Sequence, residues 1–182
     1  MRAHSASVAE SSRPVRWGDA CLGRAVVIRK SKNSVDRSRN IQRFQEASRA
    51  GWGELAVVVH QGIPATEVED LAELLALPFD ELCAALSLPP STIRRKARNR
   101  EALPADQGER VLGLQRMVGQ IQTIVEECGN PKGFDAAIWA GNWLTSPLPA
   151  LEGHRGIEYL GTITGQQLLS DLLMRNISGA YS

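Results

Sequence analysis

The chain has 182 residues, of which 43% are hydrophobic and 23% are charged, so its composition is that of an ordinary globular protein with one domain or two small ones. No stretch approaches 18 uninterrupted apolar residues, and we therefore expect no membrane span. The scattered cysteines Cys21, Cys83 and Cys128 predict neither a disulfide framework nor a zinc cluster, and they favour a cytoplasmic protein.

The net charge of only +1 conceals a strong segregation of charge along the chain. Residues 61–90 carry six acids and no base, residues 94–100 carry five cations, and residues 101–182 carry nine acids against five bases. A basic block between two acidic regions says more about binding than the overall charge does.

Residues 1–40 form a basic segment that we expect to be mostly disordered, because it is rich in Ser and Arg and poor in long apolar runs. The short apolar stretch at residues 25–28 leaves room for one strand. The Arg and Ser bias also resembles an organellar transit peptide, although little helical period supports that alternative.

Residues 41–103 are predicted to form a helical domain. Apolar residues recur every three or four positions from about Ile41, which predicts a helix. Gly62 is suited to a left-handed cap at the end of that helix. Because residues 57–59 are all valine, a short strand there is the alternative.

A pair of short helices follows the next amphipathic helix, which covers residues 68–75. The first of the pair begins at Pro78 and carries Cys83, expected to be a small packed residue where the two helices cross. Residues 87–90 include two consecutive prolines and must form a turn, after which Ser91 is a suitable N-cap.

Residues 104–182 are predicted to form a second helical domain, and no alternation of strands and helices is visible, so the fold class is all-α. Trp139 and Trp143 stand four residues apart and are expected to pack as a pair on one helix. Four residues mark the expected helix ends: Gly129 as a stop, Asn130 and Pro131 as the next start, and Thr164 as the last N-cap.

The basic block at residues 91–98 can form an amphipathic helix, because Ile93 and Ala97 fall on one side and the cations on the other. Two short helices joined by a tight turn match a helix-turn-helix, whose second helix enters the major groove of DNA. Arg can pair bidentately with guanine, and Ser, Thr and Lys can bind phosphate. The predicted DNA-binding residues are Ser91, Thr92, Arg94, Arg95, Lys96 and Arg98. The alternative is an ordinary solvated cationic face.

The C-terminal third carries a second pattern. Residues 143–160 read W-L-T-S-P-L-P-A-L-E-G-H-R-G-I-E-Y-L, and residues 177–182 read I-S-G-A-Y-S. Both runs resemble the toxin-binding domain of the Xre/MbcA/ParS family of bacterial antitoxins, and the resemblance extends from about Ile41 to Ser182. Leu148, Glu152 and Gly156 depart from the family pattern, which has Asn, Gly and Pro there.

The resemblance implies a partner, namely a toxin of the RES, ParT or MbcT type that consumes NAD or transfers ADP-ribose. Antitoxins of this family block the toxin's NAD cleft with their carboxyl-terminal end. Carried onto this sequence, the resemblance implies the following toxin-binding residues: His154, Arg155, Arg175, Asn176, Ser178, Gly179, Ala180, Tyr181 and Ser182.

The joint pattern predicts an antitoxin that inhibits its toxin by occlusion and represses its own operon by binding operator DNA. A homodimer within a toxin–antitoxin hetero-oligomer is expected, since one short helix reads few base pairs. No catalytic residue, metal site or cofactor is predicted, because the sequence contains no nucleophile–base pattern, P-loop or metal-ligand motif. The alternative is a helix-turn-helix regulator without a toxin partner.

Overall fold

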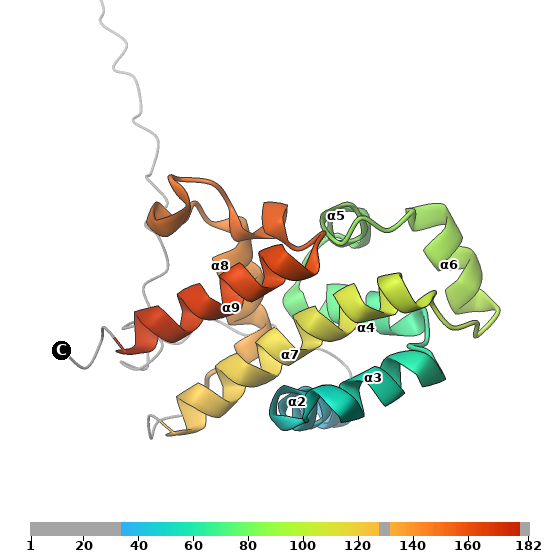
Figure 1. Cartoon of the computed structure of the whole chain (residues 1–182), viewed down its shortest axis with the longest axis horizontal. Helices are drawn as coiled ribbons and strands as arrows, with labels where there is room; N and C mark the ends of the chain where they lie inside the picture. The colour runs from blue at the N-terminus through green and yellow to red at the C-terminus, as the bar shows by residue number, and fades with distance from the viewer. Residues whose placement is uncertain (1–33, 128–131, 179–182) are drawn as a thin grey trace, which may run out of the picture.

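The computed structural model describes residues 34–127 and 132–178, and its α-helices and two short 3-10 helices confirm the predicted all-α class (Figure 1). No strand is present among these residues, and their β-type pairing is limited to two isolated bridges. The elements are α2 (Ser34–Arg49), α3 (Trp52–Gln61), α4 (Thr66–Leu75), α5 (Phe79–Ala85), α6 (Pro90–Arg98), α7 (Ala105–Glu127), α8 (Ala136–Thr145), η1 (Pro149–Leu151), η2 (Gly156–Tyr159) and α9 (Ile163–Ser178).

The prediction of a single helix from about Ile41 to Gly62 was wrong in two respects. This stretch is two helices, α2 and α3, because the chain leaves the helical conformation at Gly51, where φ is −71° and ψ is 157°. It also begins at Ser34, inside the segment expected to be disordered, and residues 57–59 are helical and do not form a strand. Residues 1–33 lie outside the described part of the chain.

Contacts distant in sequence hold α2 in place. Arg37 donates from Nε to Asp135 Oδ2 at 2.7 Å and from its terminal nitrogen to the Leu74 carbonyl at 2.8 Å. Phe44 is only 1% exposed, and its carbonyl approaches α7 at Gly119, where a Cβ would collide with it. These contacts offset the loss of backbone entropy when a polar helix becomes ordered. Because the partners are distant in the sequence, the local sequence does not reveal them.

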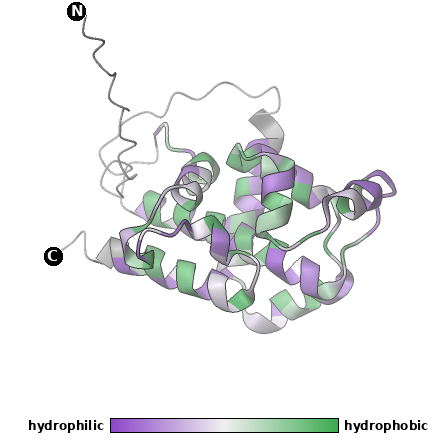
Figure 2. Ribbon diagram, turned by 90° about the horizontal axis from the view of Figure 1, so that it is seen from above, coloured by the Kyte–Doolittle hydropathy of each residue, from purple (hydrophilic) through white to green (hydrophobic). Residues whose placement is uncertain are grey.

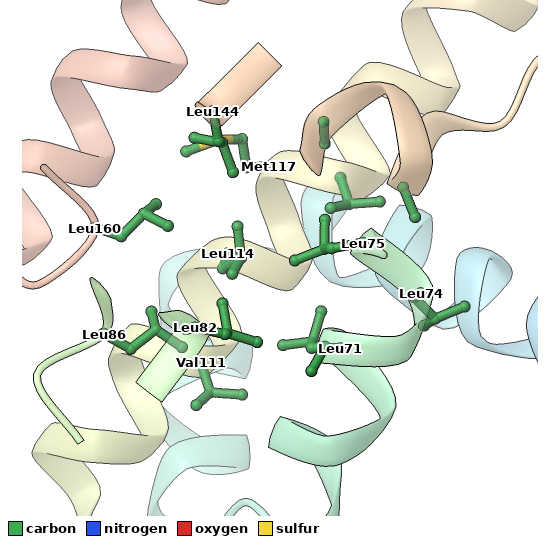
Figure 3. Close-up of a cluster of buried hydrophobic side chains, with 14 of the residues drawn as sticks. Leu71, Leu74, Leu75, Leu82, Leu86, Val111, Leu114, Met117, Leu144 and Leu160 are labelled. Atoms are coloured by element: carbon green, nitrogen blue, oxygen red, sulfur yellow. The ribbon is translucent and has the colours of Figure 1, made fainter. Parts of the chain in front are cut away.

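One hydrophobic core joins the two predicted domains. Figure 3 shows leucines of α4 and α5 gathered against α7, with Leu144 and Leu160 approaching the same helix from the C-terminal half. The labelled side chains are Leu71, Leu74, Leu75, Leu82, Leu86, Val111, Leu114, Met117, Leu144 and Leu160, each 5% exposed or less. Helix α7 therefore serves both halves, and the boundary between residues 103 and 104 stays a prediction.

The α5–turn–α6 unit has the predicted inner face. Ile93 is fully buried and Ala97 is 6% exposed, while Cys83 is fully buried in the first helix of the pair. The predicted N-cap was wrong: Pro89 is the N-cap, and Pro90 occupies the first helical position, so Ser91 already lies within the helix. Proline suits that position because its missing N–H has no intrahelical acceptor there.

Two further helix starts differ from their predictions. Helix α8 begins at Ala136, where the Asp135 carboxylate accepts a hydrogen bond from the Ile138 amide at 3.0 Å. Thr162, and not Thr164, caps α9, since its hydroxyl accepts from the Gly165 amide at 3.0 Å. Asn130, Pro131 and Gly129 lie outside the described residues.

The predicted tryptophan pair is confirmed. The rings of Trp139 and Trp143 stack with their centroids 6.0 Å apart and an angle of 12° between their planes. Both side chains are buried in the core, so they stabilise α8 and are not available to a ligand.

Candidate nucleic-acid and partner interfaces

Helix α6 presents a hydrophilic face at one end of the molecule. It lies at the far right of Figure 1, and Figure 2 shows the same end as strongly hydrophilic. Ser91, Arg94, Arg95 and Arg98 are exposed and Thr92 is half-buried, so five of the six predicted DNA-binding residues reach the surface. The burial of Ile93 and Ala97 fixes this orientation of the helix.

Two of these cations are already paired with carboxylates. Arg94 lies 2.9 Å from Asp80 Oδ1, and its guanidinium stands over the Phe79 ring at 4.6 Å from the centroid. Arg95 lies 3.1 Å from Glu101 Oε1. Both pairs are largely exposed, so they are weak, and a phosphate could replace either carboxylate at small cost.

Lys96 differs from its neighbours because it faces inward. Its side chain is only 19% exposed, and Nζ donates to Glu101 Oε2 at 3.3 Å and to the Ala102 carbonyl at 3.2 Å. Hydrogen bonds from Asn99 and then Lys96 lower the pKa of the Glu101 carboxyl. Lys96 therefore ties the end of α6 to the following loop.

Arg98 and Arg100 are exposed, and neither forms an ion pair with another described residue. Arg100 follows α6 in the left-handed conformation, with φ at 57°. Sequence reasoning left Arg100 out of the predicted site because a helix ending at Arg98 places it beyond the cationic face. Together the two residues supply the unengaged positive charge at this end.

The loop between α8 and α9 carries the predicted partner residues His154 and Arg155, both exposed. Arg155 donates from Nε to Glu158 Oε1 at 3.1 Å, and His154 Nδ1 lies 3.3 Å from Glu158 Oε2. The Arg155 hydrogen bond, followed by that of His154, lowers the pKa of Glu158. The loop thus offers a small cluster of mixed charge to a partner.

The loop keeps a compact, hydrogen-bonded conformation although Leu148 and Gly156 depart from the family pattern. Leu148 is 8% exposed and packs into the core, while its amide donates to the His154 carbonyl at 3.0 Å and its carbonyl accepts from Gly153 at 3.0 Å. Gly156 is buried against Leu144 and Leu169, which leaves no room for a larger residue without displacement. Backbone bonds and burial therefore replace the turn that an Asn side chain would stabilise.

Helix α9 carries the predicted partner residues Arg175, Asn176 and Ser178 at the end opposite to α6 (Figure 1). Leu169 and Leu173 are fully buried and fix the helix on the core, while Arg175 is exposed. Asn176 and Ser178 lie in its last turn, and Gly179, Ala180, Tyr181 and Ser182 lie outside the described residues. The end of α9 is thus remote from α6, whereas Arg155 lies beside α5, where it lines one hollow with Glu81 and Ala84.

Other kinds of site find no support in the described ranges 34–127 and 132–178. No group of three or more His, Cys, Asp or Glu side chains there could hold a metal ion. None of the helices in those ranges is both long and apolar enough for a membrane crossing.

Comparison with known proteins identifies two units. Residues 54–116 match the antitoxin Xre-like helix-turn-helix domain, and residues 134–176 match the antitoxin Xre/MbcA/ParS C-terminal toxin-binding domain. The chain is also 38% identical over 125 residues to the "Prs ADP-ribosylating antitoxin" of Sphingobium sp. (strain YBL2), covering 69% of this chain and 79% of the relative. The first unit contains α6, and the second contains α8, the loop with His154 and Arg155, and most of α9.

Proposed function

Because the chain belongs to the Xre/MbcA/ParS family of antitoxins, we propose that it neutralises a toxin that consumes NAD or transfers ADP-ribose by occluding the toxin's active site with residues 177–182. The antitoxin of Sphingobium carries ADP-ribosylation in its name, which supports that class of toxin chemistry. The contacts proposed for the toxin are those of His154, Arg155, Arg175, Asn176 and residues 178–182.

The observation that carries this proposal is the placement of α9. Leu169 and Leu173 anchor the helix, so its last turn projects from a rigid base at the edge of the molecule (Figure 1). Residues 179–182, if extended, would span about 14 Å. That reach is enough to enter a nucleotide cleft, where the Tyr181 ring could fill apolar space at low entropic cost.

Deletion of residues 177–182 tests the occlusion. The truncated chain is expected to fold and to bind operator DNA, because the deletion leaves in place every described residue of the core and of α6. It is expected to leave the toxin's NAD turnover uninhibited. NAD turnover by the purified toxin with each chain provides the measurement, and Tyr181→Ala serves as a smaller change. Full inhibition by the truncated chain would refute occlusion, and absence of any toxin complex with the intact chain would favour a regulator without a toxin.

We further propose that α6 reads operator DNA through Ser91, Thr92, Arg94, Arg95 and Arg98, with Lys96 setting the end of the helix. The exposed cations and the buried inner face support this assignment. A homodimer would place two α6 helices on half-sites about 34 Å apart. Autorepression of the operon would follow from occupancy of such a site.

Replacing Arg95 and Arg98 together by Ala is expected to weaken operator binding by about 1–3 kcal/mol for each base-reading contact that is lost. The log–log salt dependence should also fall by roughly 0.9 for each phosphate contact removed. Fluorescence anisotropy at several salt concentrations gives both numbers. Arg49→Ala, which removes an exposed cation from α2, is the control. Equal operator affinity for the double variant and the control would place the DNA reader elsewhere.

A further inference from the structure

Helix α3 exposes an apolar face that the rest of the described chain does not cover. Leu55 is its only buried residue, whereas Trp52 is 72% exposed. A helical projection places Trp52, Leu55, Ala56 and Val59 on one side, so the exposed positions form a stripe. A large exposed apolar patch on a small domain usually marks a site where another molecule binds.

This stripe forms one wall of a groove of about 570 Å³ between α3 and α9, with α7 as its floor. Figure 1 shows α7 lying between these two helices. The α9 wall runs from Ile163, which is 49% exposed, to Met174, which is 50% exposed. These twelve residues of helix, separated by eleven rises of about 1.5 Å, span roughly 16 Å, or three turns, so the groove has the length of a short amphipathic helix.

The charges at the groove favour a cationic occupant. Its own base, Arg116, is engaged, because the guanidinium stands over the Trp52 ring at 4.7 Å and donates to the Ala47 carbonyl at 3.2 Å. Glu109 and Asp171 also line the groove and are exposed. A second copy docked on the same surface would add two more acids and only an Arg116 that is already engaged, and that arrangement is unfavourable.

The position of α9 indicates which protein supplies the occupant. Most of α9 belongs to the toxin-binding unit matched at residues 134–176, and it leads directly into residues 177–182. A toxin that receives those residues in its cleft has its body next to the Met174 end of the groove. The opposite wall and the floor belong mainly to the helix-turn-helix unit matched at residues 54–116, so an occupant would touch both units.

We propose that the α3–α7–α9 groove is a second docking site for the toxin, which would insert an amphipathic helix with an apolar face and a flanking Lys or Arg. The inference rests on the proposed function and adds a site that residues 177–182 do not provide. The apolar face of the inserted helix would pack on Trp52, Ile163 and Met174. Its cation would meet Glu109 and Asp171.

The test compares Trp52→Glu and Met174→Glu with matched controls on the same helices. Val57, 54% exposed on α3, and Leu168, 39% exposed on α9, do not line the groove, so Val57→Glu and Leu168→Glu add the same charge elsewhere. All four sites are at the surface, and circular dichroism will verify that the variants fold. Affinity for the purified toxin is measured by calorimetry, in the full chain and in the chain lacking residues 177–182.

Each groove variant is expected to lose at least tenfold in toxin affinity, and the controls to stay within twofold of the parent chain. The truncated chain retains the groove together with His154, Arg155, Arg175 and Asn176, and in it Trp52→Glu is expected to weaken the residual binding by at least tenfold. Equal affinities for groove variants and controls would overturn the proposal. So would a Trp52→Glu variant that binds the toxin normally but loses self-association, measured as molar mass by light scattering.

These results separate the groove from the proposed function. If the intact chain does not bind the toxin, the proposed function fails first. If it binds, and truncation releases the toxin's activity while Trp52→Glu has no effect on affinity, only the groove proposal fails.

Discussion

Glu152 occupies a backbone conformation that suits glycine better. It ends η1 with φ at 56° and ψ at 28°, in the left-handed region, and the family pattern has Gly at this position. An L-residue there costs roughly 1–2 kcal/mol, while glycine loses about 0.5–1 kcal/mol more backbone entropy on folding. The first effect is the larger, so the side chain of Glu152 is a net cost to the folded loop.

Glu152→Gly is therefore expected to raise the free energy of unfolding by up to about 1 kcal/mol, measured by urea denaturation. Glu109→Gly is the matched control, because Glu109 is exposed within α7 and loss of helix propensity should lower stability by about 1 kcal/mol. A decrease in stability for Glu152→Gly similar to that of the control would contradict the argument from φ.

Cys83 has the role that its sequence position predicts. It is fully buried in α5, and burial, followed by the charge of Asp80, raises the pKa of its thiol to about 11. The thiol therefore remains protonated at neutral pH and behaves as a small apolar side chain.

At the scale of elements, the sequence allowed the helix-turn-helix unit to be predicted because its signals are local. Pro78 and the pair Pro89-Pro90 mark the ends of α5 and α6, and the spacing of Ile93 and Ala97 gives the buried face. Prolines fix helix starts through their own geometry, so the start of α5 was misplaced by one residue and the N-cap of α6 by two.

Elements that depend on distant contacts were predicted less well. The start of α2 depends on Arg37 reaching Asp135, 98 residues away, and α8 approaches α4 so closely that a Cβ at Gly141 would collide with the Leu75 carbonyl. The spacing of apolar residues predicts a helix and its buried face, but it does not predict such long-range contacts. Reading Gly141 from sequence as an ordinary helix residue misses that it permits this crossing.

In the candidate site too, features set by the local sequence were predicted and features set by the tertiary arrangement were not. The outward direction of Arg94, Arg95 and Arg98 follows from the helical period, but the inward bonds of Lys96 to Glu101 and Ala102 depend on how the chain turns after α6. Trp52 was not predicted as a site residue, because its local sequence does not distinguish an exposed tryptophan from a buried one. Its exposure becomes visible only when α3, α7 and α9 are placed together.

At the scale of the molecule, the two family units share their core although they carry separate interfaces. Leu144 and Leu160 of the C-terminal half join Leu82 and Leu86 of the N-terminal half around α7. A partly buried network joins α2, α4 and α7 as well, since Glu67 accepts from Arg43 at 2.6 Å and from Gln115 at 2.8 Å. Losing either half would expose the apolar surface of α7 that the other half covers.

The chain is therefore expected to unfold in one cooperative transition, with calorimetric and van't Hoff enthalpies that agree at a protein concentration where the oligomeric state is constant. A fragment of residues 104–182 should lack a cooperative transition, because Val111 and Leu114, both fully buried in the whole chain, would lose the cover of α4 and α5. Calorimetry of the full chain and circular dichroism of the fragment make the measurement. Two resolved transitions, or a fragment that melts cooperatively, would mean that the halves are independent domains, and a toxin bound at one could not alter the stability of the other.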